Sequence, residues 1–165
     1  MASYLILDGY NVIGALDRYR DADSFDTARE LLINDALKAA GWTGRQIMIV
    51  FDAHRSPESE RVEPRAGGAV LVVYSAPGES ADDVIERLLG NLDGPATIYT
   101  ADFALQRTAL ARGVSRAAPR EFAELLDELP AARTHGAPRR SRIYDRLSPE
   151  TLRKLEEIRR RAGGR

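Results

Sequence analysis

Residues 4–9 have the sequence YLILDG, in which a short apolar run is followed by Asp8 and Gly9. A continuous apolar run that stops at turn-forming residues is typical of a strand covered on both faces of a sheet. A carboxylate directly at the end of such a strand is costly to bury unless it has a partner. We therefore interpret Asp8 as a functional residue in preference to a simple turn after the strand.

The same kind of run recurs along the chain and alternates with helical patterns. Further strands are predicted over 46–51, 69–74, 96–100 and, more briefly, 114–117. Helices are predicted over 26–40, 81–92, 102–112 and 119–129, with Ser24 and Ser80 as N-caps and Gly41 ending the first. Loops are expected after Asp8, around Asn11 and Gly14, and over 53–68. This alternation predicts an α/β fold with a mostly parallel sheet flanked by helices.

Aspartates fall where these predicted strands end. Asp52 follows the second strand, Asp102 lies just past the fourth, and Asp82 is in the first turn of the helix after the third. The carboxyl ends of parallel strands share one edge of the sheet, where ligands bind. Converging carboxylates stay ionised if a cation joins them, and all-oxygen ligands favour Mg²⁺ or Mn²⁺. Such a cluster suits metal-assisted hydrolysis of a phosphodiester.

Simpler roles stay open for several of these side chains. For Asp82, a metal ligand and a favourable charge at a helix N-terminus have equal weight. Asp102 fits an N-cap as well as a ligand, and Asp52 is expected to be a supporting ligand. We interpret the neighbouring Asp83 as a helix N-terminal charge only.

Two further residues near the aspartates have both a binding and a structural interpretation. Asn11 could bind a metal-bound water or a phosphate, or cap a turn. Thr100 could hydrogen-bond Asp102 or the substrate, although an ordinary residue at a strand end is the simpler reading. We expect His54 on the surface, and Trp42 and the tyrosines to be ordinary core or surface aromatics.

Composition excludes several classes of protein. The 165 residues suit one main domain, and the absence of Cys excludes disulfide scaffolds, Cys-ligated zinc and thiol catalysis. The sequence has no GxxxxGK[ST], GxGxxG or GxSxG motif, which argues against P-loop, dinucleotide-binding and α/β-hydrolase proteins. No apolar run suits a membrane span, and no basic n-region suits a signal peptide, so we expect a cytoplasmic protein without membrane contact.

The charge is unevenly distributed along the chain. Residues 133–165 hold 11 Lys and Arg against four Asp and Glu, although the whole chain has a net charge of −1. We divide the chain into a domain over 1–130 and a basic linker with a C-terminal helix over 131–165. A solvated helix face with a charged terminus is one explanation of this basic stretch. Arg also suits phosphate binding, and we favour contact of Arg139, Arg140 and Arg142 with RNA without reading of its sequence.

Five segments together resemble the YacP-like NYN-domain family, which belongs to the PIN-like ribonuclease superfamily. They are LILDGYNVIG (5–14), IVFDAHRSP (49–57), VVYSAPGESADDVIERL (72–88), TIYTADFALQ (97–106) and LSPETLRKLEEIRR (147–160). The resemblance implies a Rossmann-like PIN fold with about five strands and a divalent-metal endoribonuclease that leaves 5′-phosphate and 3′-hydroxyl ends. It also implies mRNA on the ribosome as a substrate, and so the ribosome as a partner.

The family's motifs fall on particular residues of this chain. Its first Asp and the following Asn fall on Asp8 and Asn11, its G-E-T-A-D aspartate on Asp82, and the acid after the second strand on Asp52. Its T-S-D motif falls on Thr100-Ala101-Asp102. Two departures are Ser80 in place of Thr, which keeps a capping hydroxyl, and Ala101 in place of Ser, which loses one.

The leading hypothesis is a single-strand-directed endoribonuclease in which Asp8, Asp82 and Asp102 bind Mg²⁺ or Mn²⁺. One alternative is a non-catalytic RNA- or ribosome-binding module that keeps the fold. Another is a small-molecule phosphohydrolase, but the D-x-D-x-T signature of the aspartyl-phosphate type is absent because position 10 is Tyr10.

Overall fold

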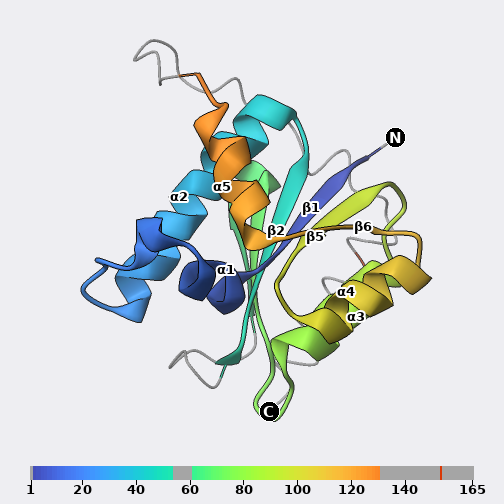
Figure 1. Cartoon of the computed structure of the whole chain (residues 1–165). Helices are drawn as coiled ribbons and strands as arrows, with labels where there is room; N and C mark the ends of the chain where they lie inside the picture. The colour runs from blue at the N-terminus through green and yellow to red at the C-terminus, as the bar shows by residue number, and fades with distance from the viewer. Residues whose placement is uncertain (1, 54–60, 131–152, 154–165) are drawn as a thin grey trace.

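A computed structural model describes residues 2–53, 61–130 and Arg153 of the chain. The described part forms one six-stranded sheet in the order β3-β4-β2-β1-β5-β6 (Figure 1). Every strand pair is parallel except β3 with β4, so the sheet is mostly parallel, as predicted. The strands are β1 (Tyr4–Asp8), β2 (Gln46–Phe51), β3 (Arg61–Arg65), β4 (Val70–Tyr74), β5 (Ala96–Tyr99) and β6 (Ser115–Ala117).

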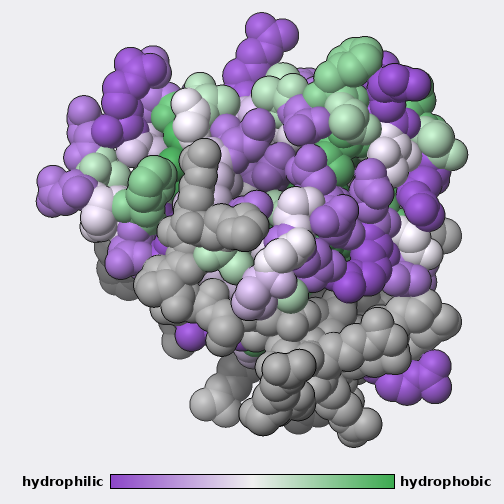
Figure 2. Space-filling model, turned by 90° about the horizontal axis from the view of Figure 1, so that it is seen from below, coloured by the Kyte–Doolittle hydropathy of each residue, from purple (hydrophilic) through white to green (hydrophobic). Residues whose placement is uncertain are grey.

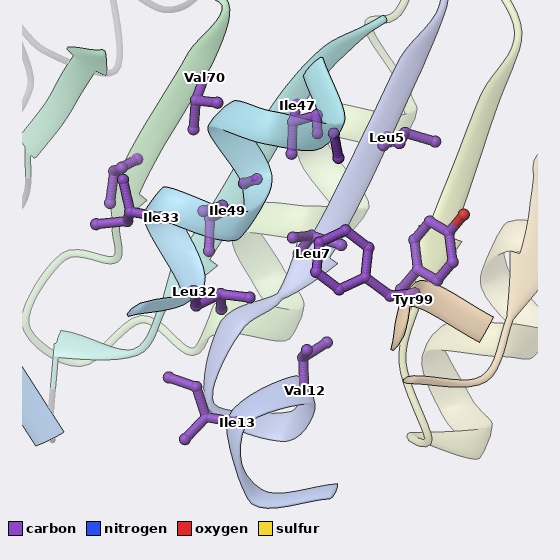
Figure 3. Packing of buried hydrophobic residues seen from close by; sticks show 14 of the residues in the cluster. Leu5, Leu7, Val12, Ile13, Leu32, Ile33, Ile47, Ile49, Val70 and Tyr99 are labelled. Carbon is purple, nitrogen blue, oxygen red and sulfur yellow. The ribbon is translucent and has the colours of Figure 1, made fainter. Parts of the chain in front are cut away.

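Helices cover both faces of this sheet. They are α1 (Gly9–Ala15), α2 (Phe25–Thr43), α3 (Ala81–Leu89), α4 (Phe103–Ala111) and α5 (Pro119–Asp127), with short 3₁₀ turns η1 (Asp17–Tyr19) and η3 (Ala66–Gly68). One buried cluster joins the sheet to α1, α2 and α5, and a second joins its other face to α3 and α4. Alternate residues of β1 divide between them: Leu5 and Leu7 face α2, and Tyr4 and Ile6 face α3 (Figure 3 shows the first cluster). The continuous apolar strands therefore reflect burial on both faces.

The four helices predicted between residues 26 and 129 are confirmed, with ends that differ by a few residues. Ser24 caps α2 by accepting a hydrogen bond from the backbone N–H of Thr27, and Ser80 caps α3. The prediction that Gly41 ends α2 is wrong, because the helix continues to Thr43. Gly44 ends it instead, since its φ of 68° provides the left-handed conformation that a helix C-terminus often requires.

The prediction of a loop directly after Asp8 is also wrong. Residues Gly9–Ala15 form α1, which begins directly after Asp8, the last residue of β1, without a connecting loop. The helix buries Val12 and Ile13 against the α2 side of the sheet (Figure 3). These long-range contacts stabilise a helix that is too short to be predicted from its own sequence.

The polar segment predicted as a loop over 53–68 contains a strand, which raises the number of strands from about five to six. β3 pairs antiparallel with β4 at one edge of the sheet. Arg61 lies over the ring of Tyr74 with 5.1 Å to the centroid, and Arg65 pairs with Glu30 at 3.0 Å. An edge strand is half exposed and tolerates polar residues and Pro64, so it lacks the apolar pattern used to predict the other strands.

The basic extension predicted over 131–165 lies outside the described residues, apart from Arg153. Arg139, Arg140 and Arg142 are therefore not placed. Among residues 2–53 and 61–130, no helix has the length and apolar character needed to cross a membrane.

Replacing Gly41 with Ala should stabilise the protein. An added Cβ meets no atom within 4 Å, and residue 41 lies inside α2. Alanine lowers the entropy cost of forming a helix by about 0.5–1 kcal/mol relative to glycine. Urea denaturation should show a higher free energy of unfolding for Gly41→Ala; a lower value would contradict the placement of Gly41 in open space.

Candidate active site

A pocket of about 590 Å³ opens at the carboxyl edge of the sheet, where β1 lies between β2 and β5. From β1 the chain runs to β2 on one side, whereas the later strand β5 pairs with β1 on the other side, so the strand order reverses here. Open α/β sheets bind ligands at such a point. Figure 2 views the molecule from this edge and shows mostly hydrophilic residues on the described surface. The pocket is lined by Asp8, Tyr10, Asn11, Gly14, Ala15, Asp52, Ser80, Ala81, Asp82 and Ala101.

Asp8 is the most buried aspartate of this site. Its position as the last residue of β1 leaves it only 8% exposed. Thr100, which is fully buried, donates a hydrogen bond from Oγ1 to Asp8 Oδ2 at 2.9 Å. Thr100 Oγ1 also accepts a hydrogen bond from the backbone N–H of Asp102 at 3.0 Å. Thr100 thus joins two of the predicted ligands, a more specific role than that of an ordinary strand-end residue.

Burial and neighbouring charges make Asp8 a weak acid. Its pKa is raised from 3.8 to about 6, mainly by desolvation, although the hydrogen bond from Thr100 opposes the shift. The charges of Asp82, Asp102 and Asp52 contribute to the same rise. The structure therefore brings the four predicted aspartates into one electrostatic cluster.

Asp82 and Asp102 approach each other from two different helices. Asp82 is in the first turn of α3, where burial raises its pKa; the charge of Asp102 and a hydrogen bond with its carboxyl group raise it too. Asp102 is also the N-cap of α4, because its Oδ1 accepts hydrogen bonds from the N–H groups of Ala104 and Leu105. The capping role foreseen for Asp102 is present, and it coexists with the contact to Asp82.

Asp83 has the structural role expected from the sequence. It forms a capping box with Ser80: the Asp83 N–H donates to Ser80 Oγ, and the Ser80 N–H donates to Asp83 Oδ2. These hydrogen bonds lower the pKa of the exposed Asp83 carboxyl. The adjacent residues Asp82 and Asp83 therefore differ in role: Asp83 caps α3, whereas Asp82 lines the pocket.

Asn11 connects the two sides of the pocket. Its Oδ1 accepts a hydrogen bond from the backbone N–H of Ala101 at 2.7 Å, which ties α1 to the turn between β5 and α4. This bond does not depend on the side chain of residue 101. The replacement of the family's Ser by Ala101 therefore leaves the tie between the two segments intact.

Tyr10 is a site residue that sequence reasoning missed. Tyr10 lines the pocket, and Arg29 donates a hydrogen bond to its hydroxyl at 2.8 Å. In the sequence, Tyr10 could have been singled out only by its position two residues after Asp8, in the first turn of α1 next to the end of β1.

The donor set fits a hard divalent cation in its chemistry. Asp8, Asp52 and Asp82 line the pocket, Asp102 contacts Asp82, and all offer carboxylate oxygens. Within the described residues, however, no three acidic or histidine side chains are gathered closely enough to form a metal site by themselves. Mg²⁺ usually binds one or two carboxylates and keeps several waters, a mode that needs no such group of three.

Replacing Thr100 with Val should raise the pKa of Asp8 above about 6. The Thr100 hydroxyl stabilises the charged carboxylate, so its loss leaves only the effects that favour protonation. A ¹³C NMR titration of the Asp8 carboxyl carbon would measure the shift. Thr100→Ser, which keeps the donor, should retain the lower value; an unchanged or lower pKa in Thr100→Val would contradict the assigned hydrogen bond.

Known proteins agree with this architecture. The model of the YacP-like NYN domain matches residues 5–160. The chain is 34% identical over 123 residues to the protein YacP of Bacillus subtilis strain 168, covering 72% of this chain and 71% of that protein. Two crystal structures of Rae1 (YacP) from Bacillus subtilis are also similar. The one of a single-substitution mutant has a TM-score of 0.63 at 27% identity, covering 96% of this chain and 92% of that one. The other has a TM-score of 0.62 at 25% identity, covering 95% of this chain and 94% of that one. With this sheet and this pocket, the chain belongs to the YacP-like NYN domain family of the PIN-like nuclease superfamily.

Proposed function

We propose that the protein is a divalent-metal-dependent endoribonuclease that cleaves single-stranded RNA. The observation that carries the proposal is the buried carboxyl of Asp8, which shares one pocket with Asp52 and Asp82. Its pKa is raised by burial and, to a lesser extent, by the charges of Asp82, Asp102 and Asp52. Concentrating negative charge in this way is unfavourable for the protein alone and favourable for binding a cation. Membership of a nuclease-type family supports the same reaction.

In this proposal, the residues of the site have metal-binding and positioning roles. Asp8 and Asp82 would bind Mg²⁺ or Mn²⁺, with Asp102 and Asp52 in support. A bound divalent ion activates water and offsets charge on the phosphate. Thr100 holds the Asp8 carboxylate through its hydroxyl, and Asn11 fixes the turn that carries Ala101. Hydrolysis with departure of the 3′ oxygen would leave 5′-phosphate and 3′-hydroxyl ends.

The basic extension would supply affinity for the RNA backbone. We propose Arg139, Arg140 and Arg142 as phosphate contacts, because an acidic pocket by itself repels a polyanion. mRNA on the ribosome is the substrate that we propose. Removing residues 139–165 should weaken RNA binding and reduce its salt dependence.

Cleavage of a labelled single-stranded RNA in Mn²⁺ or Mg²⁺ tests the proposal, with the neighbouring residues Asp82 and Asp83 as a matched pair. Asp82→Asn should slow cleavage at least about 10-fold, because each unit of about 1.4 kcal/mol in the barrier is tenfold in rate. Asp83→Asn should cleave at the wild-type rate, since Asp83 only caps α3.

Chelation by EDTA should stop cleavage, and adding back the metal should restore it. Equal rates in the two variants would remove Asp82 from the mechanism. RNA binding without metal-dependent cleavage in the wild type would instead support the non-catalytic RNA-binding alternative.

A further inference from the structure

A row of aromatic rings leads from the pocket to the surface. Tyr10, which lines the pocket, packs against the buried Phe51 with ring centroids 5.0 Å apart. It also contacts Phe25, the first residue of α2, with ring centroids 5.8 Å apart and an interplanar angle of 83°. Phe25 is 55% exposed. The row therefore presents an open aromatic surface beside the candidate active site.

The inner ring of this pair is held rigidly. Arg29 donates a hydrogen bond to the Tyr10 hydroxyl at 2.8 Å and is itself 5% exposed. Arg29 also forms an ion pair with Asp26. Because Tyr10 is held by this bond and by Phe51, a ligand stacking there would pay little to order the ring.

The chemistry around Phe25 selects the kind of ligand. The next residue, Asp26, neutralises Arg29 through their ion pair, and Asp23 lies two residues before Phe25 in the sequence, so the charges next to Phe25 do not favour a phosphate. A nucleobase is the flat, uncharged part of a nucleotide and stacks readily on aromatic side chains. The surface therefore suits a base, while the pocket suits the phosphate.

We propose that Phe25 and Tyr10 form a subsite that stacks one unpaired base of the RNA beside the phosphate in the pocket. This proposal rests on the proposed function and extends it to the way in which the strand is positioned. The rings are nearly perpendicular, so a base parallel to one is perpendicular to the other. The angle between the Tyr10 and Phe25 rings therefore leaves room for one stacked base and not for two stacked on each other.

Binding of a fluorescent single-stranded RNA, measured by anisotropy in the non-cleaving Asp8→Asn background, tests the subsite. Phe25→Ala should weaken binding by about 5- to 150-fold, the range expected for one stacked base. Phe25→Trp should restore it, while Phe25→Leu should stay weak because it keeps apolar character without a flat face. Trp42→Ala is the matched control: it removes an aromatic of similar exposure (57%) roughly 25 Å further along the same helix, and binding should be unchanged.

The outcomes separate this subsite from the proposed function, which is judged by metal-dependent cleavage in the wild type. If the wild type cleaves RNA and Phe25→Ala binds it as tightly as the parent, the subsite is wrong and the nuclease stands. If Phe25→Ala weakens binding but the wild type does not cleave, the subsite stands and the nuclease is wrong. Full affinity in Phe25→Leu, or no RNA binding by the parent, would overturn the subsite.

Discussion

Asp8→Asn should stop RNA cleavage and at the same time make the protein more stable at neutral pH. Asparagine has nearly the same shape, and its oxygen can still accept the hydrogen bond from Thr100. It removes the charge proposed to bind the metal, so we expect cleavage to fall at least about 100-fold, which corresponds to about 3 kcal/mol in the barrier.

The gain in stability follows from the pKa of Asp8, which is raised from 3.8 to about 6 in the folded protein. The folded state then binds the proton more tightly than the unfolded state, so ionisation of Asp8 disfavours folding. The penalty is absent below about pH 4, grows between about pH 4 and 6, and is complete above about pH 6, where it reaches at most about 3 kcal/mol. Asp8→Asn removes it.

Chemical denaturation of both proteins in EDTA across pH 4–8 measures this effect. The free energy of unfolding of Asp8→Asn should exceed that of the wild type at pH 7.5, and the difference should vanish towards pH 4. Divalent metal should narrow the gap at pH 7.5 by stabilising only the wild type. A variant that is less stable than the wild type at pH 7.5, or that cleaves equally well, would contradict the role given to Asp8.

Gly9→Ala should destabilise the protein by about 3 kcal/mol, the upper part of the range for overpacking a core. A Cβ at residue 9 would lie 2.4 Å from Cε1 and 2.5 Å from Cδ1 of Phe51, and 2.9 Å from the backbone oxygen of Val50. Phe51 is fully buried between Tyr10 and Tyr74, and Val50 is in the centre of the sheet, so neither can move freely.

A double-mutant cycle with Phe51→Leu checks the cause of this loss. Leucine lacks the Cε1 atom that would lie 2.4 Å from the new methyl group, and its δ carbons can rotate away from it. Gly9→Ala should therefore cost at least about 1 kcal/mol less in the Phe51→Leu background. Gly41→Ala serves as the control for the same substitution in open space, where a gain is expected. Additive effects of the two mutations would show that the ring of Phe51 is not the obstacle.

Local sequence pattern was sufficient for the parts of the molecule that are buried or capped locally. Strands such as Tyr4–Asp8 and Gln46–Phe51 were predictable because burial on both faces demands continuous apolar residues. The caps at Ser24 and Ser80 were predictable because a cap depends on neighbours three residues away. The half-exposed strand β3 and the short helix α1 depend on distant partners and were missed.

The sequence by itself determined that several aspartates follow strands of a parallel sheet, and therefore that they share an edge. Only the tertiary structure decided their roles, because the contacts that separate them join remote parts of the chain. Thr100 donates to Asp8 across 92 residues, and Asp102 meets Asp82 from another helix while its own oxygen caps α4. The burial of Asp8 and the exposure of Phe25 also result from packing between helices and strands, so they cannot be predicted from the local sequence.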